Sequence, residues 1–429
     1  MSKLLIKGGR VVDPAAGLDA KRDVLIEEGR ISKVGTRIVV RGVKVIEAKG
    51  MLVMPGLIDM HVHLRDPGRP DKETIASGTR AAARGGFTTV CCMANTEPPI
   101  DNPAVVKYVR NKAETEGVVN VYPIAAVTRG LKGEGLTEMG MMLEEGAVAF
   151  SDDGHSVMRS DTMRKALEYA RQFGVPIIAH CEDRGLSHGG AMNESALSTA
   201  IGLPGIPSLA EEVMVARDIL LAREFGKVHI AHVSSAGSVE LLRRAKRRKT
   251  PVTCETCPHY FSLTEEAARE YDTNAKVNPP LKSEKDVKAV IKGLQDGTID
   301  VVATDHAPHN IEEKNVEFNQ ASSGMVGLET ALALVLTKLV EPKILPIKKA
   351  IVKLTAAPAR ILGLNKGTLK VGADADVIIV DPKAEWTVDA AQFASKSRNT
   401  PFQGWKLKGK VLYTIVGGKV VVRDGKLAA

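Results

Sequence analysis

Six side chains that can bind a divalent metal ion stand at the ends of short apolar runs in this 429-residue chain. They are His61 and His63 in LIDMHVHLRDPG, Asp153 in AFSDDGH, His180 in IIAHCED, His232 in HIAHVSS and Asp305 in VATDHAPH. Imidazole nitrogens and carboxylate oxygens are common zinc ligands, and two ions held close together lower the pKa of a water between them. Six ligands are enough for two ions, so these residues predict a binuclear centre that activates water.

The spacing of these residues indicates how they meet. His61 and His63 are two apart in a strand-like run, so their side chains point to the same face. The other four candidates also end strand-like runs. In a parallel barrel the catalytic groups gather at the rim where the strands end. The joint placement therefore favours one metal centre over scattered core histidines.

Strand-like runs alternate with helix-like segments through the middle of the chain, which is typical of parallel β/α units. We expect eight strands, at residues 57–64, 87–93, 119–127, 146–152, 175–181, 227–234, 252–257 and 301–306. Amphipathic helices are expected at residues 72–85, 103–117, 161–173, 209–225, 237–249, 284–295 and 325–340. Eight such units predict an α/β fold, a (β/α)8 barrel of the TIM type over residues 55–365, as the catalytic domain.

The two ends of the chain resemble each other. Residues 4–12 and 413–422 both contain two strand-like runs around a Gly-Gly pair, a pattern that predicts a tight hairpin. Further short β runs lie at residues 23–26, 31–34, 44–47 and 376–380. We therefore expect one small β-sandwich domain assembled from residues 1–54 and 366–429.

Composition favours an ordinary globular enzyme over a membrane or nucleic-acid-binding protein. The formal charge is +8, but the densest basic cluster, residues 243–249, ends an expected helix without interleaved aromatic residues, so we expect a solvated helix end. No apolar run approaches the ~20 residues of a membrane-spanning helix and no signal peptide is visible, so we expect a cytoplasmic protein. Cys254 and Cys257 would face opposite sides of a strand and are expected in the core.

The motifs HVHLRDPG, FTTVCCMANTEPPIDN, AFSDDG, AHCED, HVSS, NPPL and ATDHAPH together resemble the bacterial type I dihydroorotases of the amidohydrolase superfamily. The resemblance covers nearly the whole chain, and HVHLRDPG with DHAPH is its most specific part. It implies two zinc ions per chain. The first would be held by His61, His63 and Asp305 and the second by His180 and His232, with Asp153 and a hydroxide as bridges.

The same resemblance implies a reversible interconversion of N-carbamoyl-L-aspartate and L-dihydroorotate in pyrimidine biosynthesis, with a small anionic substrate. The residues that it implies in substrate binding are His63, Arg65, Asn95, Asn278, His309, Ser323 and Gly324. The planar guanidinium of Arg65 suits a carboxylate, whereas the two asparagines could simply form turns. Asp305 would be the catalytic residue, which binds a metal and carries a proton from the attacking hydroxide to the leaving ring nitrogen.

Two other functions stay open. Hydantoinases, dihydropyrimidinases and allantoinases resemble this pattern but use a carboxylated lysine on the fourth strand, where this chain has Asp152 and Asp153 and no lysine. Lys132 lies in a loop before that strand, and Asp152 is the rival of Asp153 as the bridge. Alternatively, a catalytically silent homologue could serve as a structural partner of aspartate carbamoyltransferase, although such members typically lose metal ligands. A homodimer and a complex with that transferase are both possible assemblies.

Four further features lie near the expected ligands. Cys181, beside His180, is expected to pack away from the barrel interior, with occupation of a metal position as the alternative. His229 is expected in the core or at an interface, and His259 just outside the ligands. Residues 310–324, charged and then rich in Ser and Gly, are expected to form a mobile loop over the rim.

Overall fold

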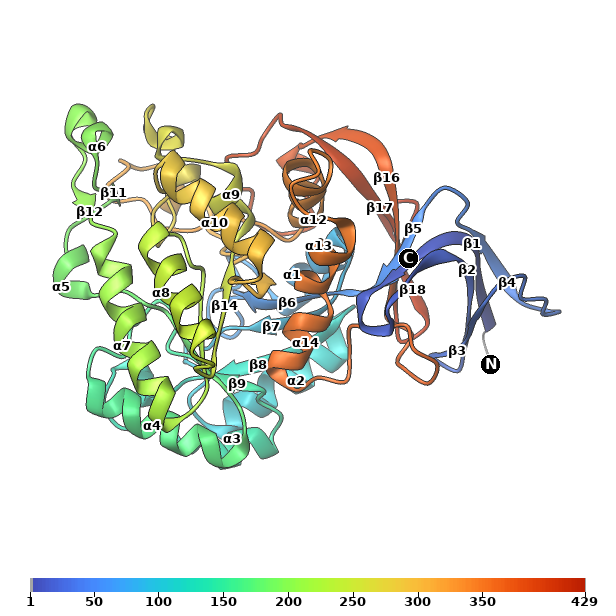
Figure 1. Ribbon diagram of the computed structural model, residues 1–429, viewed down its shortest axis with the longest axis horizontal. Coiled ribbons are helices and arrows are strands. Elements are labelled where there is room, and N and C mark those ends of the chain that lie inside the picture. The colour runs from blue at the N-terminus through green and yellow to red at the C-terminus, as the bar shows by residue number, and fades with distance from the viewer. Residues whose placement is uncertain (1–2, 429) are drawn as a thin grey trace.

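The computed structural model describes residues 3–428 and contains a barrel of eight parallel strands (Figure 1). The strands are β6 Leu57–Val62, β7 Phe87–Cys92, β8 Asn120–Ala125, β9 Ala149–Phe150, β10 Ile177–Ala179, β13 Val228–Ile230, β14 Val252–Thr256 and β15 Val301–Val302. They are hydrogen-bonded in the order β15-β14-β13-β10-β9-β8-β7-β6. A parallel bridge between Val62 and His306 joins the end of the last strand to the first. The eight expected strands and the barrel are therefore confirmed.

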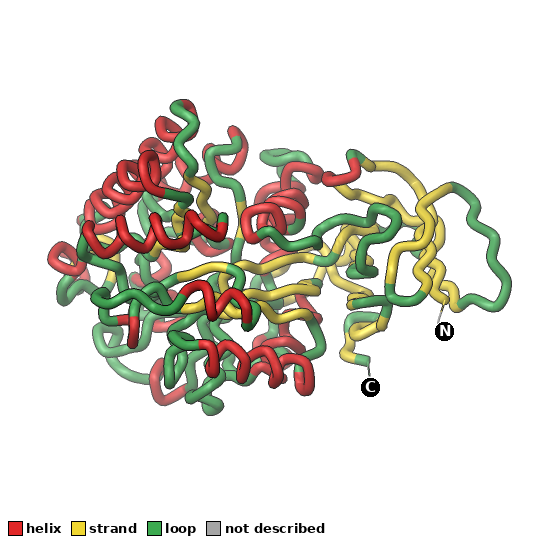
Figure 2. Tube along the Cα trace, turned by 90° about the horizontal axis from the view of Figure 1, so that it is seen from below, coloured by secondary structure: helices red, strands yellow, loops and turns green. Residues whose placement is uncertain are grey.

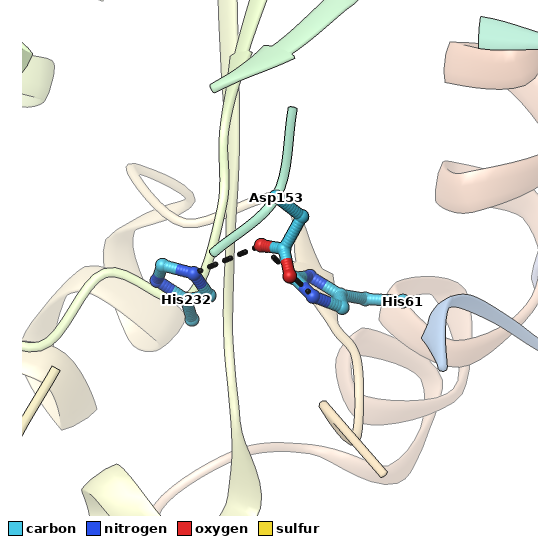
Figure 3. A group of neighbouring side chains, drawn as sticks. All are labelled: His61, Asp153 and His232. Atoms are coloured by element: carbon cyan, nitrogen blue, oxygen red, sulfur yellow. Dashed lines mark ion pairs between the residues drawn. The ribbon is translucent and has the colours of Figure 1, made fainter. Parts of the chain in front are cut away.

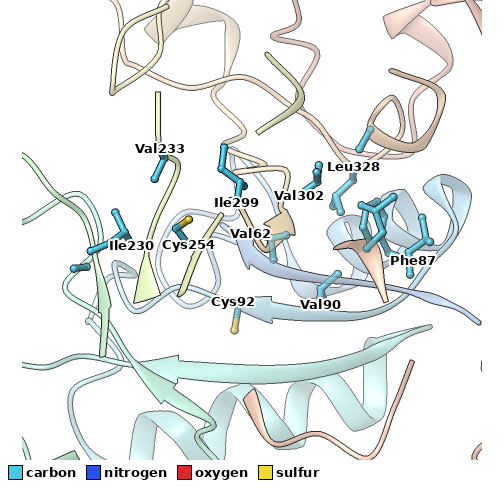
Figure 4. Close-up of a cluster of buried hydrophobic side chains, with 14 of the residues drawn as sticks. Val62, Phe87, Val90, Cys92, Ile230, Val233, Cys254, Ile299, Val302 and Leu328 are labelled. Carbon is cyan, nitrogen blue, oxygen red and sulfur yellow. The ribbon is translucent and has the colours of Figure 1, made fainter. Parts of the chain in front are cut away.

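Alternation along the strands sends one set of side chains inward and the other toward the helices. Val62 lies between His61 and His63 and packs in the largest apolar cluster, together with Phe87 and Leu328 (Figure 4). A shift of one residue along β6 would bury both imidazoles in that apolar layer. The hydrophobic pattern of the strand thus fixes which way the two histidines face.

Helices cover the outside of the barrel (Figure 1). Their bounds are α1 Ile75–Gly85, α2 Pro103–Glu116, α3 Met139–Glu144, α4 Ser160–Phe173, α5 Arg184–Ser187, α6 Ala196–Ile201, α7 Leu209–Phe225, α8 Ala236–Arg247, α9 Pro258–Ser262, α10 Glu284–Asp296, α11 Ile311–Lys314, α12 Ala331–Val335, α13 Ile347–Leu354 and α14 Ala356–Leu362. A separate two-stranded sheet pairs β11 Met192–Asn193 with β12 Gly205–Ile206. Helix α1 begins later than expected because the Thr74 hydroxyl accepts the Ser77 N–H and the Ser77 hydroxyl accepts the Thr74 N–H.

The prediction of a helix at residues 325–340 is wrong for its first turn. Helix α12 begins at Ala331 and continues as a π-helical turn, Leu336–Val340. Met325 instead forms a parallel bridge with His306, and the Gly327 N–H donates to His306 Nδ1 at 3.2 Å. The backbone of this stretch holds the loop after β15, so it is not available for helical hydrogen bonds.

The two ends of the chain form a second, smaller domain beside the barrel (Figures 1 and 2). Its strands are β1 Lys3–Asp13, β2 Leu18–Glu27, β3 Arg30–Gly35, β4 Lys44–Glu47, β5 Leu52–Pro55, β16 Val377–Thr387, β17 Lys406–Val416, β18 Lys419–Arg423 and β19 Lys426–Leu427. They form one nine-stranded sheet, ordered β19-β18-β17-β16-β5-β1-β2-β3 with β4 beside β1. Its core joins Ile6 and Val53 to Val377 and Ile415, so the β domain built from both termini is confirmed. The exact domain boundaries stay a prediction.

One of the two expected Gly-Gly hairpins is confirmed and the other is wrong. Gly417 and Gly418, with φ of 52° and 79°, form the turn between β17 and β18. Gly8 and Gly9 instead lie inside β1, where the register against β2 shifts. A Cβ at Gly9 would lie 2.5 Å from Val53 Cγ2, so this glycine permits the close approach of a neighbouring strand and not a turn.

A segment from the C-terminal part of the chain returns to the barrel between β16 and β17. Val388, Phe393 and Phe402 of this segment pack with Met325 and Leu334 of the barrel. The residues at 394–400 lie against the rim loops, which they contact through hydrogen bonds described below. The small domain therefore contributes to the surroundings of the rim.

The basic cluster at residues 243–249 is paired with acidic neighbours. Arg243 Nη2 lies 3.0 Å from Asp296 Oδ2, and Lys246 Nζ lies 2.5 Å from Asp300 Oδ2. These pairs agree with the solvated helix end expected from the sequence. Among residues 3–428, no helix is both long enough and apolar enough to span a membrane.

Candidate metal centre

The side chains of the predicted ligands meet at the C-terminal rim of the barrel, with Asp153 in the middle. Asp153 Oδ1 lies 3.4 Å from His61 Nε2 and 3.5 Å from His232 Nε2 (Figure 3). The same oxygen lies 3.6 Å from His180 Nδ1. The other oxygen, Oδ2, lies 3.5 Å from His63 Nε2. One carboxylate therefore faces all four imidazoles, which is the arrangement a bridging ligand needs.

Among residues 3–428, three sets of three side chains offer ligand atoms that all lie within 4.8 Å of one another, and two of these sets contain His61. One set is His61, Asp153 and His232, and the other is His61, His63 and Asp305. In the second set, Asp305 Oδ1 is 3.1 Å from His63 Nε2 and 3.5 Å from His61 Nε2. The two sets share His61, so two ion positions would lie side by side.

His180 stands next to these sets but belongs to neither of them. Its Nδ1 lies 2.8 Å from His232 Nε2, and its Nε2 lies 2.9 Å from Glu182 Oε2. Burial disfavours the charged imidazole, but Asp153 and Glu182 outweigh it and raise the pKa of His180 to about 9. Hydrogen bonds therefore hold His180, the sixth predicted ligand, close to the other five.

The chemistry of the cluster fits a bound cation. His61 Nδ1 donates to Glu255 Oε1 at 2.6 Å and His63 Nδ1 donates to Asn95 Oδ1 at 2.9 Å, so both Nε2 lone pairs face the centre. His61 Nε2 and Asp153 Oδ1 are buried and have no hydrogen-bond partner among the described residues. These two atoms lie 3.4 Å apart, and an ion bound to both of them would satisfy both.

Electrostatics supports the same conclusion. Burial disfavours the charged form of His61, but the carboxylates of Asp153, Asp305 and Glu255 outweigh it and raise its pKa. The cluster is therefore a strongly negative environment in a buried place. A positive ion would neutralise it.

Glu255 is a site residue that the sequence analysis missed. It is fully buried on β14 and also lies 3.3 Å from His229 Nε2. Burial opposes its ionisation, but His61 and His229 outweigh that and lower its pKa to about 2. The signal was present, because Glu255 lies inside the strand expected at residues 252–257, and a glutamate is rarely buried there without a partner.

Three site residues have a left-handed backbone. The φ angles are 57° for Arg65, 36° for His232 and 49° for Asp305. Residues other than glycine adopt this region at a cost, and such strain gathers where a side chain must be aimed at a functional site. The strands therefore end in turns that direct these three side chains over the rim.

Asp152 and Cys181 face away from the cluster. Asp152 Oδ1 accepts the backbone N–H groups of Val127 and Thr128 at 2.8 and 3.0 Å, and its other oxygen binds the Thr128 hydroxyl. Cys181 is buried, with Sγ 3.5 Å from Asp218 Oδ2. These contacts leave Asp153 as the carboxylate of the SDD sequence that reaches the centre.

Arg65 and His309 lie together beside the cluster. Arg65 Nε donates to Pro308 O at 3.3 Å, and Arg65 Nη2 lies 3.4 Å from His309 Nε2. His309 Nδ1 donates to Glu313 Oε2 at 2.6 Å. Burial, reinforced by the charge of Arg65, lowers the pKa of His309 to about 3, so this imidazole is neutral next to a fixed cation.

The two asparagines predicted to bind substrate contact other site residues. The Asn95 amide accepts from His63 Nδ1 and donates to the Asp153 carbonyl at 3.2 Å. Asn278 Nδ2 donates to Glu182 Oε2 at 3.0 Å, and Glu182 holds His180. Neither asparagine serves only as a turn residue, because both side chains join the hydrogen bonds around the ligands.

Residues 310–324, expected as a mobile loop, are anchored at several points. Part of the segment forms α11, and the buried Lys314 donates to Ser322 O at 2.7 Å. Ser323 O lies 2.9 Å from His309 Nε2, and the Gly324 N–H donates to Lys276 O at 2.9 Å. The predicted backbone contacts therefore lie beside His309, at the edge of the cluster.

Two further histidines pack close to the ligands. His229 is buried between Thr253 and Glu255, with Nδ1 2.8 Å from Thr253 Oγ1. His259 is buried with an unpartnered Nε2 among the described residues, and with Cys257 it offers ligand atoms near Asp305. Burial lowers the pKa of His259 to about 4, so it stays neutral there.

Comparisons with known proteins agree with this architecture. Residues 52–421 match the amidohydrolase family. The chain is 60% identical over 423 residues to the dihydroorotase of Pelotomaculum thermopropionicum, with 98% of this chain and 99% of the relative covered. It is 56% identical to the dihydroorotase of Acetivibrio thermocellus over the same coverage. Among solved structures, the L-hydantoinase of Arthrobacter aurescens is similar, with a TM-score of 0.90 and 27% identity over 100% of this chain and 98% of that one.

Proposed function

We propose a reaction for a chain that belongs to the amidohydrolase family and, within that family, to the dihydroorotases. It interconverts N-carbamoyl-L-aspartate and L-dihydroorotate by making and breaking a cyclic amide bond, in pyrimidine biosynthesis. The observation that carries the proposal is the convergence of four imidazoles on Asp153, beside Asp305 and the half-buried Arg65.

The metal requirement of the family is met in this proposal by two zinc ions. His61, His63 and Asp305 would hold the first, His180 and His232 the second, and Asp153 would lie between them. Support comes from the orphaned His61 Nε2 and Asp153 Oδ1 and from hydrogen bonds that fix the outer nitrogens of His61 and His63. When bound, the ions supply an electrophile for the ring carbonyl and lower the pKa of water.

Arg65 and its neighbours would orient the substrate. The Arg65 side chain is half-buried, and arginine keeps its charge in proteins, so its guanidinium offers a planar pair of donors to the single carboxylate of dihydroorotate. The backbone at Ser323 and Gly324 lies next to the same nitrogen of His309 as Arg65 and would bind the amide edge of the ring. Fixing both ends of a small ring aligns its reacting carbonyl with the cluster.

Asp305 would move the proton. Burial disfavours its ionised form, but the charge of His61 and the hydrogen bond from His63 outweigh that and hold its pKa below the ordinary range. The carboxylate is therefore free to take a proton from the attacking water. It then returns this proton to the ring nitrogen as the C–N bond breaks, and the reverse reaction uses the same two transfers in the opposite order.

The test combines metal analysis with a substrate panel. Zinc-loaded protein should hydrolyse dihydroorotate with a kcat/KM about tenfold or more above that for the uncharged dihydrouracil, because a charge-assisted contact is worth ~1.5–3 kcal/mol. It should also hold up to two ions per chain. A loaded protein that prefers dihydrouracil or hydantoin would refute the dihydroorotase assignment.

A hydantoinase-type activity is the second candidate, because solved hydantoinases share the fold. The chain from Gly146 to Asp153, which contains the fourth barrel strand, has no lysine, and Lys132 is exposed. The guanidinium of Arg65 would also have no carboxylate to bind on a neutral ring. The same substrate panel separates the two candidates.

Location and assembly are also proposals. We place the protein in the cytoplasm, and its five buried free cysteines suit a reducing compartment. A homodimer and a complex with aspartate carbamoyltransferase stay predictions. Sedimentation of the chain, alone and mixed with the transferase, would test both.

A further inference from the structure

Asn399 lies in the segment that returns from the small domain to the barrel, and its side chain joins two rim loops. Its Oδ1 accepts the His309 N–H at 3.1 Å. Its Nδ2 donates to the carbonyl of Ala307 at 3.0 Å and to that of Gly324 at 3.1 Å. Its own carbonyl accepts the Val326 N–H at 2.9 Å. One buried residue, 4% exposed, therefore holds the loop after β15 and the loop at Gly324 together.

The two loops touch where Asn399 holds them. A Cβ at Gly324 would lie 2.6 Å from the Ala307 Cβ and 3.1 Å from His309 Nε2. Gly324 also has a φ of 137°, which other residues rarely adopt. His309 and the Ser323–Gly324 backbone are therefore in direct contact. The hydrogen bonds of the Asn399 amide to both loops keep this distance constant.

A second contact from the same segment supports the loop after β15 from another side. The Ser395 hydroxyl binds Glu73 Oε2, and the Lys396 N–H donates to Glu73 Oε1 at 3.1 Å. Glu73 Oε2 in turn lies 3.3 Å from the ring of His306, next to Asp305. The segment therefore holds the DHAPH loop at both ends of the motif.

We propose that Asn399 is a positioning residue for substrate binding, which acts through His309 and the Ser323–Gly324 backbone. This inference rests on the proposed function, because those two groups are the ones assigned to the substrate. Asn399 does not reach the cluster, and its bonds go to backbone groups of the rim. Its loss should therefore weaken substrate binding and leave the metal content unchanged.

The test is Asn399→Ala, with Gln403→Ala as the matched control. Gln403 belongs to the same segment and is exposed; its side chain contacts Ala390 and Asp389 and has no hydrogen bond to a rim loop among residues 3–428. We expect Asn399→Ala to raise KM for dihydroorotate about tenfold or more, with kcat changed by less than about threefold, since misplaced binding groups cost up to ~100-fold. Gln403→Ala should match the wild type. A folded, metal-loaded Asn399→Ala protein with unchanged KM would overturn the proposal.

A double-mutant cycle separates positioning from general stability. Because Asn399 acts in part through His309, Asn399→Ala should raise KM less in the His309→Ala background than in the wild type. Full additivity of the two effects would overturn the proposal. Asn399→Asp serves if the alanine variant does not fold, because it keeps the size but turns an oxygen toward the two carbonyls. It should raise KM in the same way, and loss of folding in both variants would make Asn399 a general structural residue and refute its specific role.

Amide hydrogen exchange gives a readout that needs no activity. Asn399→Ala should exchange faster in peptides covering residues 306–310 and 322–327, with little change in the barrel strands. Unchanged exchange there would overturn the loop contact. If the wild type does not hydrolyse dihydroorotate, the proposed function fails, and faster exchange would still support the role of Asn399 in holding the loops.

Discussion

Replacing Glu255 by glutamine tests whether the buried carboxylate behind His61 tunes the metal centre. Glu255 Oε1 accepts from His61 Nδ1 at 2.6 Å, and Oε2 lies 3.3 Å from His229 Nε2. Glutamine keeps the volume in a fully buried place and can still accept one of these bonds. The change therefore removes a charge and leaves the packing in place.

The loss of that charge should weaken the ion held by His61 and His63. The carboxylate increases the basicity of the imidazole and fixes its tautomer, and losing such a partner typically costs 10- to 100-fold in metal affinity. That range equals about 1.4–2.7 kcal/mol. The second ion, held by His180 and His232, has no contact with Glu255 and should be retained better.

The measurement is zinc content after dialysis against a series of chelator concentrations, with activity followed in the same samples. Glu385→Gln, an exposed change in the small domain, is the control for handling and for loss of a negative charge. A zinc affinity within about twofold of the wild type would refute the role assigned to Glu255. Equal weakening of both ions would show that the charge acts on the whole cluster and not through His61.

Three further outcomes are expected. Arg65→Met should raise KM for dihydroorotate about 10- to 150-fold, matching a lost charge-assisted contact of ~1.5–3 kcal/mol, and should leave dihydrouracil hydrolysis unchanged. Asp305→Asn should retain most of its zinc by metal analysis while kcat falls by about two to four orders of magnitude, and near-normal turnover would move the proton transfer to another group. Burial raises the pKa of Glu329 from 4.5 to about 7, so the folded chain holds a proton that the unfolded chain releases. The contribution of Glu329 to the free energy of unfolding should therefore fall as pH rises from about 4.5 to about 7, and Glu329→Gln should make the decrease in Tm between those pH values smaller.

Much of the barrel could be predicted because its signals are local. Each strand is a short apolar run that ends in a polar residue, and the run itself determines which side chains face inward. The six metal-binding candidates were found in this way, since each one ends such a run. The choice of Asp153 over its rival Asp152 came from the family resemblance, and the contacts of Asp152 with Val127 and Thr128 agree with it.

The errors arise where distant segments determine the local structure. Gly8 and Gly9 have the composition of a turn, but Val53 packs against Gly9 and keeps the chain in β1. Residues 325–330 have a helical pattern, but the backbone of Met325 and Gly327 is hydrogen-bonded to His306 instead. Asn399 could not be found from the sequence at all, because its partners lie some 75 to 92 positions away.

An aspartate bridge between the two proposed ion positions would fit the short fourth strand. β9 ends at Phe150, and three residues later Asp153 brings its backbone close enough for a short carboxylate to face four imidazoles. A carboxylated lysine, the bridge of the hydantoinase type, is much longer and would have to start deeper in the strand, where Ala149 and Phe150 stand. Since no group here needs carbon dioxide, zinc loading and recovery of activity after metal removal should be the same with and without bicarbonate. A requirement for bicarbonate would mean that a lysine, and not Asp153, joins the two ions.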